Sequence, residues 1–407
     1  MSKITFLLTQ DLESPSGLGR YWPMARYLAA LGHQVKIGAL HSNFNSLSKS
    51  IEKINNVSIH YLAQMHVLKK GSTKIYFPFW KLITVAVYAT LKFICFILSD
   101  TADIVYVGKP HPMNGIAGIV AKITKKSKLF LDCDDYEKNI NHFQNPLQKW
   151  IVSFFERILP FFADLIITNT MFTQQRLISA GISPKKVILI PNGIDIERFI
   201  KPSDMELEKL REELGLHKGW KIIGFIGTLG LTSHPVDLLI EAFKKVHQVI
   251  PNTKLLLVGG GEDINSLIQI SNKMNLQNDI LFTGRVPPDQ IVKYYHLMDV
   301  SVDPVYDDLA AKGRSPLKMF ESWACGVPFV TGDVGDRRML SGEPPSSFII
   351  KPGDSGELAK GILAILTEPS LSDKFRDLGK KRSQDFYWEN IISNQRHLFE
   401  VKNNETT

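Results

Sequence analysis

Short apolar segments alternate with amphipathic stretches along the first half of the chain. After the first segment comes a stretch with Met24, Leu28 and Leu31 on one face, which predicts a helix that ends at Gly32. This alternation is typical of a parallel sheet with helices on both faces. Strands are predicted at residues 4–9, 35–40, 57–62, 103–108, 128–132, 164–169 and 187–191.

The same alternation restarts in the second half, after a polar and charged stretch at residues 199–219 that contains Pro202 and predicts one short helix. With 407 residues, the chain exceeds the size at which a single core stops growing. We therefore predict two doubly wound α/β domains that meet near residue 200, with ligands bound beyond the carboxyl ends of the strands, in the cleft between the domains. The second set of strands is predicted at residues 221–229, 254–260, 280–284, 300–304 and 328–332.

The net charge of +7 is unevenly distributed along the chain. Residues 1–200 carry 23 Lys and Arg against 13 Asp and Glu, a net charge of +10, and the remainder of the chain carries −3. This asymmetry indicates an anionic partner for the first half, such as an acidic membrane surface or a phosphorylated acceptor. Nucleic acid is disfavoured, because the basic residues lack the interleaved aromatic residues of a strand-binding surface.

Residues 82–98 form the most apolar stretch, with Lys92 inside it. Three interpretations stay open: a helix packed on the sheet, a helix lying in a membrane interface, and a membrane span. The three cysteines are widely spaced and suit a reducing compartment. The first apolar run is too short for a signal peptide. We therefore expect a cytoplasmic protein, peripheral on the inner face of the membrane.

The segment at residues 313–330 contains the most distinctive chemistry. Ser315 followed by Pro316 predicts the start of a helix with a side-chain cap. A helix N-terminus favours phosphate, and Arg314 and Lys318 place two cations at the same point. Glu321 lies three residues beyond Lys318 on the same face and could accept the hydroxyls of a ribose. The alternative is a surface Lys–Glu pair on an ordinary helix.

Residues 321–330, Glu-Ser-Trp-Ala-Cys-Gly-Val-Pro-Phe-Val, resemble the signature of the family-4 glycosyltransferases of GT-B fold. The resemblance implies two Rossmann-like α/β domains that face each other across a cleft. It also implies retaining transfer of a sugar from a nucleotide diphosphate sugar to a hydroxyl acceptor. Further similar segments follow in the family's order at residues 190–199, 227–243, 255–263, 280–287 and 385–391.

The resemblance implies an acceptor-binding domain at residues 1–200, a donor domain at 201–384 and a C-terminal helix at 385–407 that packs back on the first domain. Gly17 and Gly19 match a glycine-rich loop that approaches the donor diphosphate, although a plain strand-to-helix turn explains them as well. Arg285 and Val286 match the loop that contacts the base. The implied donor-binding residues are Gly17, Gly19, Thr228, Arg285, Val286, Ser315, Leu317 and Glu321.

The chain departs from the family pattern at two places in the donor domain. Gly313 stands where the family carries a second glutamate, which leaves the identity of the donor sugar open. Thr228 and His234 stand where an Arg and a Lys usually neutralise the leaving diphosphate. We expect Arg314 and Lys318 to supply the missing charge as catalytic residues, because such a site chiefly stabilises the charge of the leaving group.

The third departure is the segment at residues 131–137, where Asp134 stands in place of the usual histidine. Asp132, Asp134 and Asp135 could form a divalent metal site, a solvated turn or contacts to sugar hydroxyls. We favour the last, with Asp134 as a catalytic residue and Asp135 and His111 as acceptor-binding residues. His111 is expected in a loop near the cleft rather than as a general base. No metal or other cofactor is expected beyond the nucleotide sugar.

The basic first half and its apolar stretch favour a lipid-linked acceptor or a cell-surface polysaccharide intermediate. They also predict peripheral contact with an anionic membrane. Two other functions fit the same fold: a sugar-nucleotide epimerase and a catalytically weak scaffold subunit that binds a nucleotide sugar.

Overall fold

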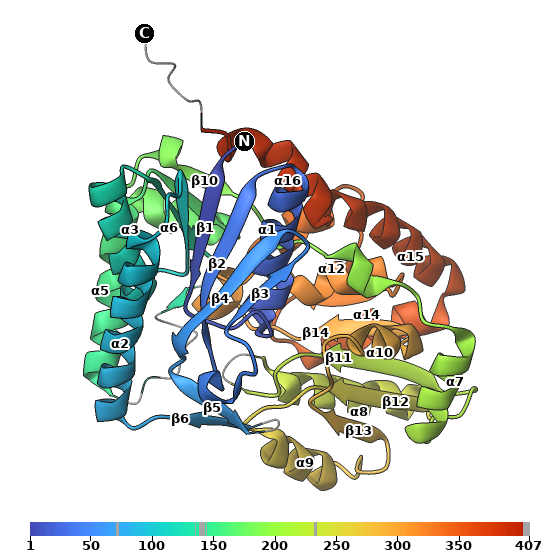
Figure 1. Cartoon of the computed structure of the whole chain (residues 1–407). Coiled ribbons are helices and arrows are strands. Elements are labelled where there is room, and N and C mark those ends of the chain that lie inside the picture. The colour runs from blue at the N-terminus through green and yellow to red at the C-terminus, as the bar shows by residue number, and fades with distance from the viewer. Residues whose placement is uncertain (71–72, 135, 138–142, 144, 232–233, 402–407) are drawn as a thin grey trace. The chain divides into compact units, whose positions relative to one another are not determined.

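The computed structural model describes residues 1–70, 73–134, 136–137, 143, 145–231 and 234–401. The chain forms two compact units (Figure 1). The first comprises Met1–Gly193 together with Trp388–Thr407, and the second comprises Ile194–Tyr387. These limits lie a few residues from the predicted domain boundaries. Both units are α/β structures built on mainly parallel sheets, as the resemblance to the GT-B fold implies.

The first unit is built on an eight-stranded sheet in the order β10-β9-β8-β7-β1-β2-β4-β3. All neighbouring strands are parallel except the edge pair of β3 (Ile51–Ile54) and β4, which is antiparallel. The sequence did not predict β3, since its four residues are all exposed and lack an apolar face. The other strands lie close to their predicted positions: β1 (Lys3–Leu8), β2 (Gln34–His41), β4 (Val57–Gln64), β7 (Ile104–Gly108), β8 (Lys128–Cys133), β9 (Leu165–Thr168) and β10 (Val187–Leu189).

Helices cover both faces of this sheet and complete two separate cores. Helices α2 (Phe79–Leu98), α3 (Pro112–Lys125), α5 (Pro146–Phe162) and α6 (Met171–Ser179) pack on one face. Helix α1 (Trp22–Ala30) and the C-terminal α16 (Trp388–Gln395) pack on the other. The buried indole of Trp388 donates a hydrogen bond of 2.8 Å to the carbonyl oxygen of Gly19, so α16 is fixed to the first unit. A hairpin of β5 (Val67–Lys70) and β6 (Thr73–Tyr76) was not predicted.

The apolar stretch that the sequence singled out is α2. Ala89, Phe93 and Ile97 form its buried stripe and pack in the core under the sheet, as the packed-helix interpretation requires. Only 17% of the most apolar 18-residue segment of the helix is buried, so most of α2 lies outside the core. By length and composition alone, α2 could also cross a membrane.

The second unit contains a six-stranded, fully parallel sheet in the order β13-β12-β11-β14-β15-β16. Helices α8 (Val236–Val249), α9 (Ile264–Lys273) and α14 (Ser355–Thr367) pack on one face. Helices α10 (Ile291–Leu297) and α12 (Leu317–Ala324) pack on the other. The strands are β11 (Lys221–Ile226), β12 (Thr253–Val258), β13 (Ile280–Gly284), β14 (Val300–Asp303), β15 (Phe329–Gly332) and β16 (Phe348–Ile350).

The predicted strand at residues 221–229 is too long, because β11 ends at Ile226 and a loop follows. The predicted short helix after Pro202 is α7 (Asp204–Glu213), and Ser203 and Glu206 form a reciprocal capping box at its start.

The strand order places a topological switch point in each sheet. In the first unit the chain moves from β1 to β2 on one side and continues with β7 on the other side of β1. In the second unit, β12 and β14 flank β11 in the same way. Ligands of doubly wound folds bind beyond the carboxyl ends of the strands at such points. The residues that follow β1 and β7, and those that follow β11 and β14, are therefore the candidates for function.

Candidate functional site

Helix α12 begins at Leu317 rather than at Pro316. Pro316 occupies the capping position, and a proline side chain has no acceptor, so the predicted cap by Ser315 with Pro316 as the first helical residue is wrong by one position. Ser315 itself is buried just before the helix. Leu317 is only partly buried at the helix start. The buried face of α12 is formed by Met319, Phe320, Ser322 and Trp323.

The side chain of Lys318 points to the switch point of the second unit. Its Nζ lies 3.0 Å from Oδ1 of Asp303, the last residue of β14, and only 12% of the lysine side chain is exposed. The other carboxylate oxygen, Oδ2, accepts a hydrogen bond of 2.9 Å from Nη2 of Arg337. Arg337 is also buried and donates from Nη1 to the carbonyl oxygens of Ala311 and Val334. Asp303 therefore fixes two cations beside the end of β14.

Arg314 reaches the same point from the segment before α12. Its Nη1 lies 3.2 Å from Nδ1 of His234, and Nζ of Lys318 lies 3.5 Å from the same nitrogen. Both neighbours are donors, so Nδ1 of His234 carries no proton and accepts. The loop after β11 and the start of α12 thus meet at His234.

Burial and the nearby charges set the protonation states of this cluster. Burial lowers the pKa of His234 well below its ordinary value, and Lys318 and Arg314 lower it further, so the ring is neutral. Burial acts to raise the pKa of Asp303, but Lys318 and Arg337 outweigh it and hold that pKa far below the usual range. Burial lowers the pKa of Lys318, which Asp303 opposes. Two cations therefore pair with Asp303, and Arg314 adds a third positive charge at His234. Such a concentration of positive charge suits an anion.

Glu321 lies one turn further along α12 and does not pair with Lys318. Its Oε2 accepts a hydrogen bond of 2.9 Å from the hydroxyl of Tyr295, a buried residue of α10. The surface Lys–Glu alternative is thus wrong, because each partner is bound by a buried side chain instead. Burial raises the pKa of Glu321, partly offset by Arg198 and by the hydrogen bond from Tyr295. The carboxylate is held in one orientation beside the cation cluster.

The remaining donor-binding candidates lie in loops at the carboxyl ends of the strands. Thr228 is exposed in the loop after β11. Arg285 and Val286 follow β13 and line a hollow of about 550 Å³, together with residues of α7 and α10. Gly313 ends the short helix α11 (Leu309–Lys312) and is buried, so this position offers no carboxylate to a sugar.

Glycines in the loop after β12 allow the loop after β11 to pack closely against it. Gly259 has φ +143°, and a Cβ there would lie within bonding distance of the carbonyl oxygen of Gly227. Gly227 N–H donates to Val258, and Leu229 N–H donates to Gly260. The glycines at 259–261 therefore support the loop that carries Thr228 and His234, and they lack the spacing of a dinucleotide-binding motif.

In the first unit, Gly17 and Gly19 lie in a short π-helical segment (Gly17–Tyr21) that leads into α1, and Gly17 has a local structural role there. A Cβ on Gly17 would collide with the backbone of Asp11 and Leu12. Gly19 accepts the hydrogen bond from Trp388. The requirement for glycine at position 17 therefore follows from packing of its own loop, so the plain-turn interpretation accounts for it; contact with a donor diphosphate stays a prediction.

Asp132 is bound by two buried side chains. Arg20 makes a bidentate pair with it, with Nε to Oδ2 at 2.7 Å and Nη2 to Oδ1 at 3.1 Å, and the hydroxyl of Tyr106 donates to Oδ2. Arg20 also donates to Oδ1 of Asn192 at 3.1 Å. A guanidinium in this position opposes a divalent cation, and no group of three metal-type ligands forms within the described residues. Asp132 is a structural residue that joins β8 to the turn after β1.

A second polar network lies at the switch point of the first unit. His111 lies 2.7 Å through Nδ1 from Oγ1 of Thr9 and 3.2 Å through Nε2 from Oε2 of Glu137. Nζ of Lys109 lies 3.0 Å from Oε1 of Glu137 and 3.4 Å from Oδ1 of Asp134. Burial acts to raise the pKa of Glu137, but Lys109 and His111 outweigh it and lower that pKa.

The structure thus brings Asp134 and His111 into one network, bridged by Lys109 and Glu137. Asp134 is buried, and 18% of the His111 side chain is exposed. Asp135, the other predicted acceptor-binding residue, lies outside the described residues.

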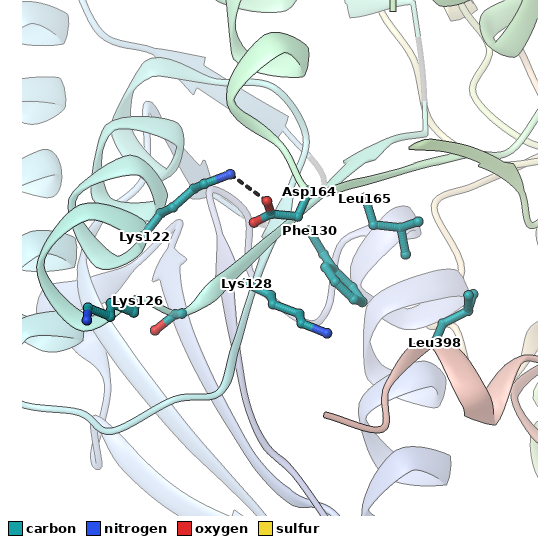
Figure 2. A pocket seen from close by; sticks show the side chains of 8 residues that line it. Lys122, Lys126, Lys128, Phe130, Asp164, Leu165 and Leu398 are labelled. Atoms are coloured by element: carbon teal, nitrogen blue, oxygen red, sulfur yellow. Dashed lines mark hydrogen bonds and ion pairs between the residues drawn. The ribbon is translucent and has the colours of Figure 1, made fainter. Parts of the chain in front are cut away.

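A separate hollow of about 450 Å³ lies at the other end of the strands of this sheet (Figure 2). Its lining includes Lys128 and Leu165, the first residues of β8 and β9, so it faces the amino ends of the strands. Lys122 in this hollow forms an ion pair of 2.6 Å with Asp164, drawn as a dashed line in Figure 2. Its place at the amino ends separates it from the switch point, where ligands of this fold bind.

Sequence reasoning missed Asp303, Arg337 and Tyr295 in the second unit and Lys109 and Glu137 in the first. Asp303 ends β14 and Lys109 directly follows β7, and both strands were predicted correctly. Their position at a switch point could therefore have identified them as candidate site residues. Arg337 and Tyr295 reach the site from elements with no distinctive motif, and only the tertiary structure brings them there.

The comparisons with known families agree with this fold. Residues 17–198 match the glycosyltransferase family 4 model, and residues 206–382 match the model of glycosyl transferases group 1. The chain has the GT-B fold, and each half of it matches a glycosyltransferase family model. Each family model falls almost entirely within one of the two units.

Individual relatives are more distant. The chain is 25% identical over 246 residues to a D-inositol 3-phosphate glycosyltransferase of Corynebacterium jeikeium, covering 58% of this chain and 57% of that protein. It is 24% identical over 216 residues to the alpha-monoglucosyldiacylglycerol synthase of Streptococcus pneumoniae, covering 51% and 48%. The chain thus spans about half the length of the curated relatives it matches. The structure of Anabaena HepE in complex with UDP and glucose aligns with a TM-score of 0.72 at 20% identity, covering 98% of this chain and 99% of that one.

Proposed function

We propose that the protein transfers a sugar from a nucleotide diphosphate sugar to a hydroxyl acceptor with retention of the anomeric configuration. The observation that carries this proposal is the cluster of Arg314, Lys318 and Arg337 around Asp303 and the neutral His234, with Glu321 fixed beside it. HepE, which shares the fold, forms a complex with UDP and glucose. A diphosphate is the part of such a donor that needs concentrated positive charge.

Each group has a part in this chemistry. Arg314 and Lys318 neutralise the diphosphate, and the positive end of the α12 dipole adds to them. Glu321 accepts the ribose hydroxyls in the orientation set by Tyr295, while the loop of Arg285 and Val286 contacts the base. Because the cations are already held in place, they stabilise the leaving phosphate without reorganisation in the transition state.

In the transfer step, the bond between the anomeric carbon and the phosphate oxygen breaks while the acceptor oxygen bonds to the same face of that carbon. The acceptor proton passes to the departing phosphate oxygen. No nucleophile on the enzyme is required, and the anomeric configuration is retained. Anomeric-proton NMR of the product tests this directly, since an inverted product would contradict the proposed stereochemistry.

The acceptor is bound by the first unit, where Asp134 and His111 meet in one network. Asp134 positions the acceptor hydroxyl or a donor sugar hydroxyl, and His111 contacts the acceptor. The basic charge of residues 1–200 and the exposed apolar surface of α2 support a lipid-linked acceptor or a cell-surface polysaccharide intermediate. One relative is named for synthesis of a glucosylated diacylglycerol, which is consistent with such an acceptor.

The proposed reaction does not use a divalent metal. The cations around Asp303 supply the charge that a metal would otherwise bring to the diphosphate, and Arg20 occupies Asp132. Transfer should therefore proceed at an unchanged rate after treatment with EDTA. A loss of activity that Mg²⁺ or Mn²⁺ restores would contradict this point.

A thermal-shift screen of nucleotide sugars tests the proposed donor. A donor at a hundred times its Kd stabilises the protein by about 2.7 kcal/mol, which raises the Tm of a unit of this size by roughly 5–10 °C. Lys318→Met should abolish the shift or weaken it strongly. The sugar and base that give the largest shift are then tested for transfer, and product analysis separates transfer from epimerisation. The absence of a shift with every UDP, GDP and ADP sugar would contradict the proposal.

A further inference from the structure

The outward face of α2 carries a row of exposed apolar side chains. Trp80, Ile83, Val87 and Leu91 follow one another at helical spacing and are 77%, 40%, 55% and 55% exposed. The buried stripe of Ala89, Phe93 and Ile97 lies on the opposite side. A helix on the surface of a globular protein normally carries polar residues on its outer face. Helix α2 instead carries apolar residues on its outer face as well, which is typical of a contact surface.

Helix α5 repeats this arrangement. Leu147, Trp150, Phe154 and Phe161 lie at helical spacing on the exposed face. The rings of Trp150 and Phe154 stack with their centroids 5.6 Å apart, which forms a broad aromatic surface. The residues buried on the other side include Leu159.

Helix α3 contacts both α2 and α5, so the three helices form one layer (Figure 1). We call the outward surface of α2, α3 and α5 the apolar face. Ile123 of α3 is 74% exposed and adds to it. The exposed apolar patches of monomeric proteins seldom exceed a few hundred Å², and larger ones mark protein or membrane contacts.

The charges on these helices distinguish between the possible partners. The three helices carry one carboxylate, Glu156, which is buried and paired with Arg176 at 2.8 Å. The same helices carry six cationic side chains: Lys81, Lys92, Lys122, Lys125, Lys149 and Arg157. A protein interface core is depleted of lysine. Aromatic side chains next to lysines are typical of surfaces that lie in the headgroup region of an anionic bilayer.

More lysines lie at the C-terminal end of α3. Lys122, Lys126 and Lys128 line the hollow of Figure 2, and Nζ of Lys122 donates 2.9 Å to the carbonyl oxygen of Phe162, the last residue of α5. The hollow therefore lies at the margin of the apolar face, where headgroup phosphates would lie if the face entered a bilayer.

The geometry points to a docking surface: we infer that the apolar face of α2, α3 and α5 lies on the surface of an anionic lipid bilayer. It does not span the bilayer, because Ala89, Phe93 and Ile97 hold α2 in the core of the first unit. Lys92, in the middle of α2, is exposed and stands over the ring of Tyr88 at 5.3 Å, close enough for its ammonium to reach headgroups. The inference deepens the proposed function, because membrane contact would bring the enzyme to a lipid-linked acceptor. The membrane contact itself is argued from the apolar face and its lysines.

Co-sedimentation with vesicles tests the inference with the full-length protein. We expect binding to vesicles of 30% phosphatidylglycerol in phosphatidylcholine, weak binding to pure phosphatidylcholine, and release as NaCl is raised to 0.5 M. The fluorescence of Trp80 and Trp150 should shift to the blue on binding. Absence of binding to anionic vesicles at low salt would overturn the inference.

Two variants separate the apolar and the charged contributions. Trp80→Ser with Trp150→Ser should weaken binding by about tenfold or more per side chain. Lys92→Gln with Lys149→Gln should weaken it by about fivefold per lysine. The matched controls are Met205→Ser with Val249→Ser and Lys244→Gln with Lys374→Gln, which change exposed residues of the second unit and should leave binding unchanged. Equal losses in test and control variants would contradict a specific face.

Misfolding and dimerisation are distinguished from lipid binding by two further measurements. Circular dichroism checks the fold of each variant, and the lysine variant keeps the test valid if the tryptophan variant unfolds. If the apolar face instead bound a second copy, the wild type would be a dimer by light scattering, the tryptophan variant a monomer, and neither would bind vesicles. Transfer to a water-soluble acceptor should survive in all variants. If the wild type binds anionic vesicles but neither it nor any variant transfers a sugar, the result would contradict the proposed function without contradicting the docking surface.

Discussion

Replacement of Lys318 by methionine tests the cation cluster most directly. Methionine keeps most of the length of the side chain but removes the charge that lies 3.0 Å from Asp303 and 3.5 Å from His234. A unit charge about 4 Å from a phosphate oxygen contributes roughly 4 kcal/mol at an effective dielectric constant of ~20. Only the charge that develops in the transition state affects kcat, so about a third to two thirds of that energy counts. We expect kcat to fall by about 10- to 100-fold.

The same substitution also disturbs the fold, and the structure predicts by how much. Asp303 loses one of its cations but keeps Arg337 at 2.9 Å. The stability loss should therefore stay below the roughly 3–5 kcal/mol that full loss of a buried partner costs. Lys318→Met combined with Asp303→Asn removes both charges and should recover part of the stability. If Lys318 acts on the donor phosphate, this double variant should not recover kcat.

A matched control is available in the same unit. Lys254 forms an ion pair of 2.7 Å with Asp279, and 11% of its side chain is exposed, compared with 12% for Lys318. Lys254 lies near the amino end of β12, away from the switch point. Lys254→Met should lose stability while its kcat at saturating donor stays unchanged. Wild-type kcat in Lys318→Met, or an equal loss of kcat in both variants, would refute the reasoning.

Further predictions concern pH and stability. Burial raises the pKa of Glu321, so the carboxylate becomes protonated as the pH falls through that raised value; the donor KM should rise on the acidic side, and Glu321→Gln should have a high KM with no such pH dependence. Asp303 and Glu137 have lowered pKa values, so their stabilisation is present above an ordinary pKa of about 4 and is lost as the pH falls below it. The free energy of unfolding, measured with urea, should therefore fall less between pH 7 and pH 3 in Asp303→Asn than in the wild type. An equal fall in both proteins would contradict this assignment. Trp388→Ala should destabilise the first unit by about 3–5 kcal/mol and leave the unfolding of the second unit unchanged, because the indole packs in the first core and bonds to Gly19. Two calorimetric transitions that shift equally would contradict this separation.

Much of the fold could be predicted because the buried strands are short apolar runs that need no tertiary information. Apart from β16, the strands of both sheets that lie between helices were predicted close to their positions. The exposed edge strand β3 was not, since all of its residues are exposed. The strand at residues 221–229 was predicted too long, because Gly227 and Leu229 continue the apolar run into a loop that bonds to the glycines after β12.

The candidate site could be predicted only in part. The motif around α12 identified Arg314, Lys318 and Glu321, because their spacing along one segment places them at one helix end. Their partners come from other strands and helices. Asp303 ends a buried strand and Tyr295 lies in an apolar helix, and neither sequence context reveals that a charge or a hydroxyl points at α12. Side-chain direction at the end of a strand depends on the packing of the whole domain.

In the proposed reaction, the cluster would replace the cations that the family resemblance leads us to expect in the loop after β11. Positive charge near a leaving diphosphate stabilises it according to distance, not according to which segment supplies it. His234 occupies one of the expected cation positions, and its neutral ring accepts from Arg314 and Lys318. The ring thereby directs two cations from the start of α12 to the loop that lacks its own. A lysine at position 234 would bring a third positive charge against these two, so His234→Lys should weaken donor binding rather than strengthen it. If that variant binds the donor more tightly in a thermal-shift assay, position 234 has simply lost a useful cation. Arg314 and Lys318 would then not replace it.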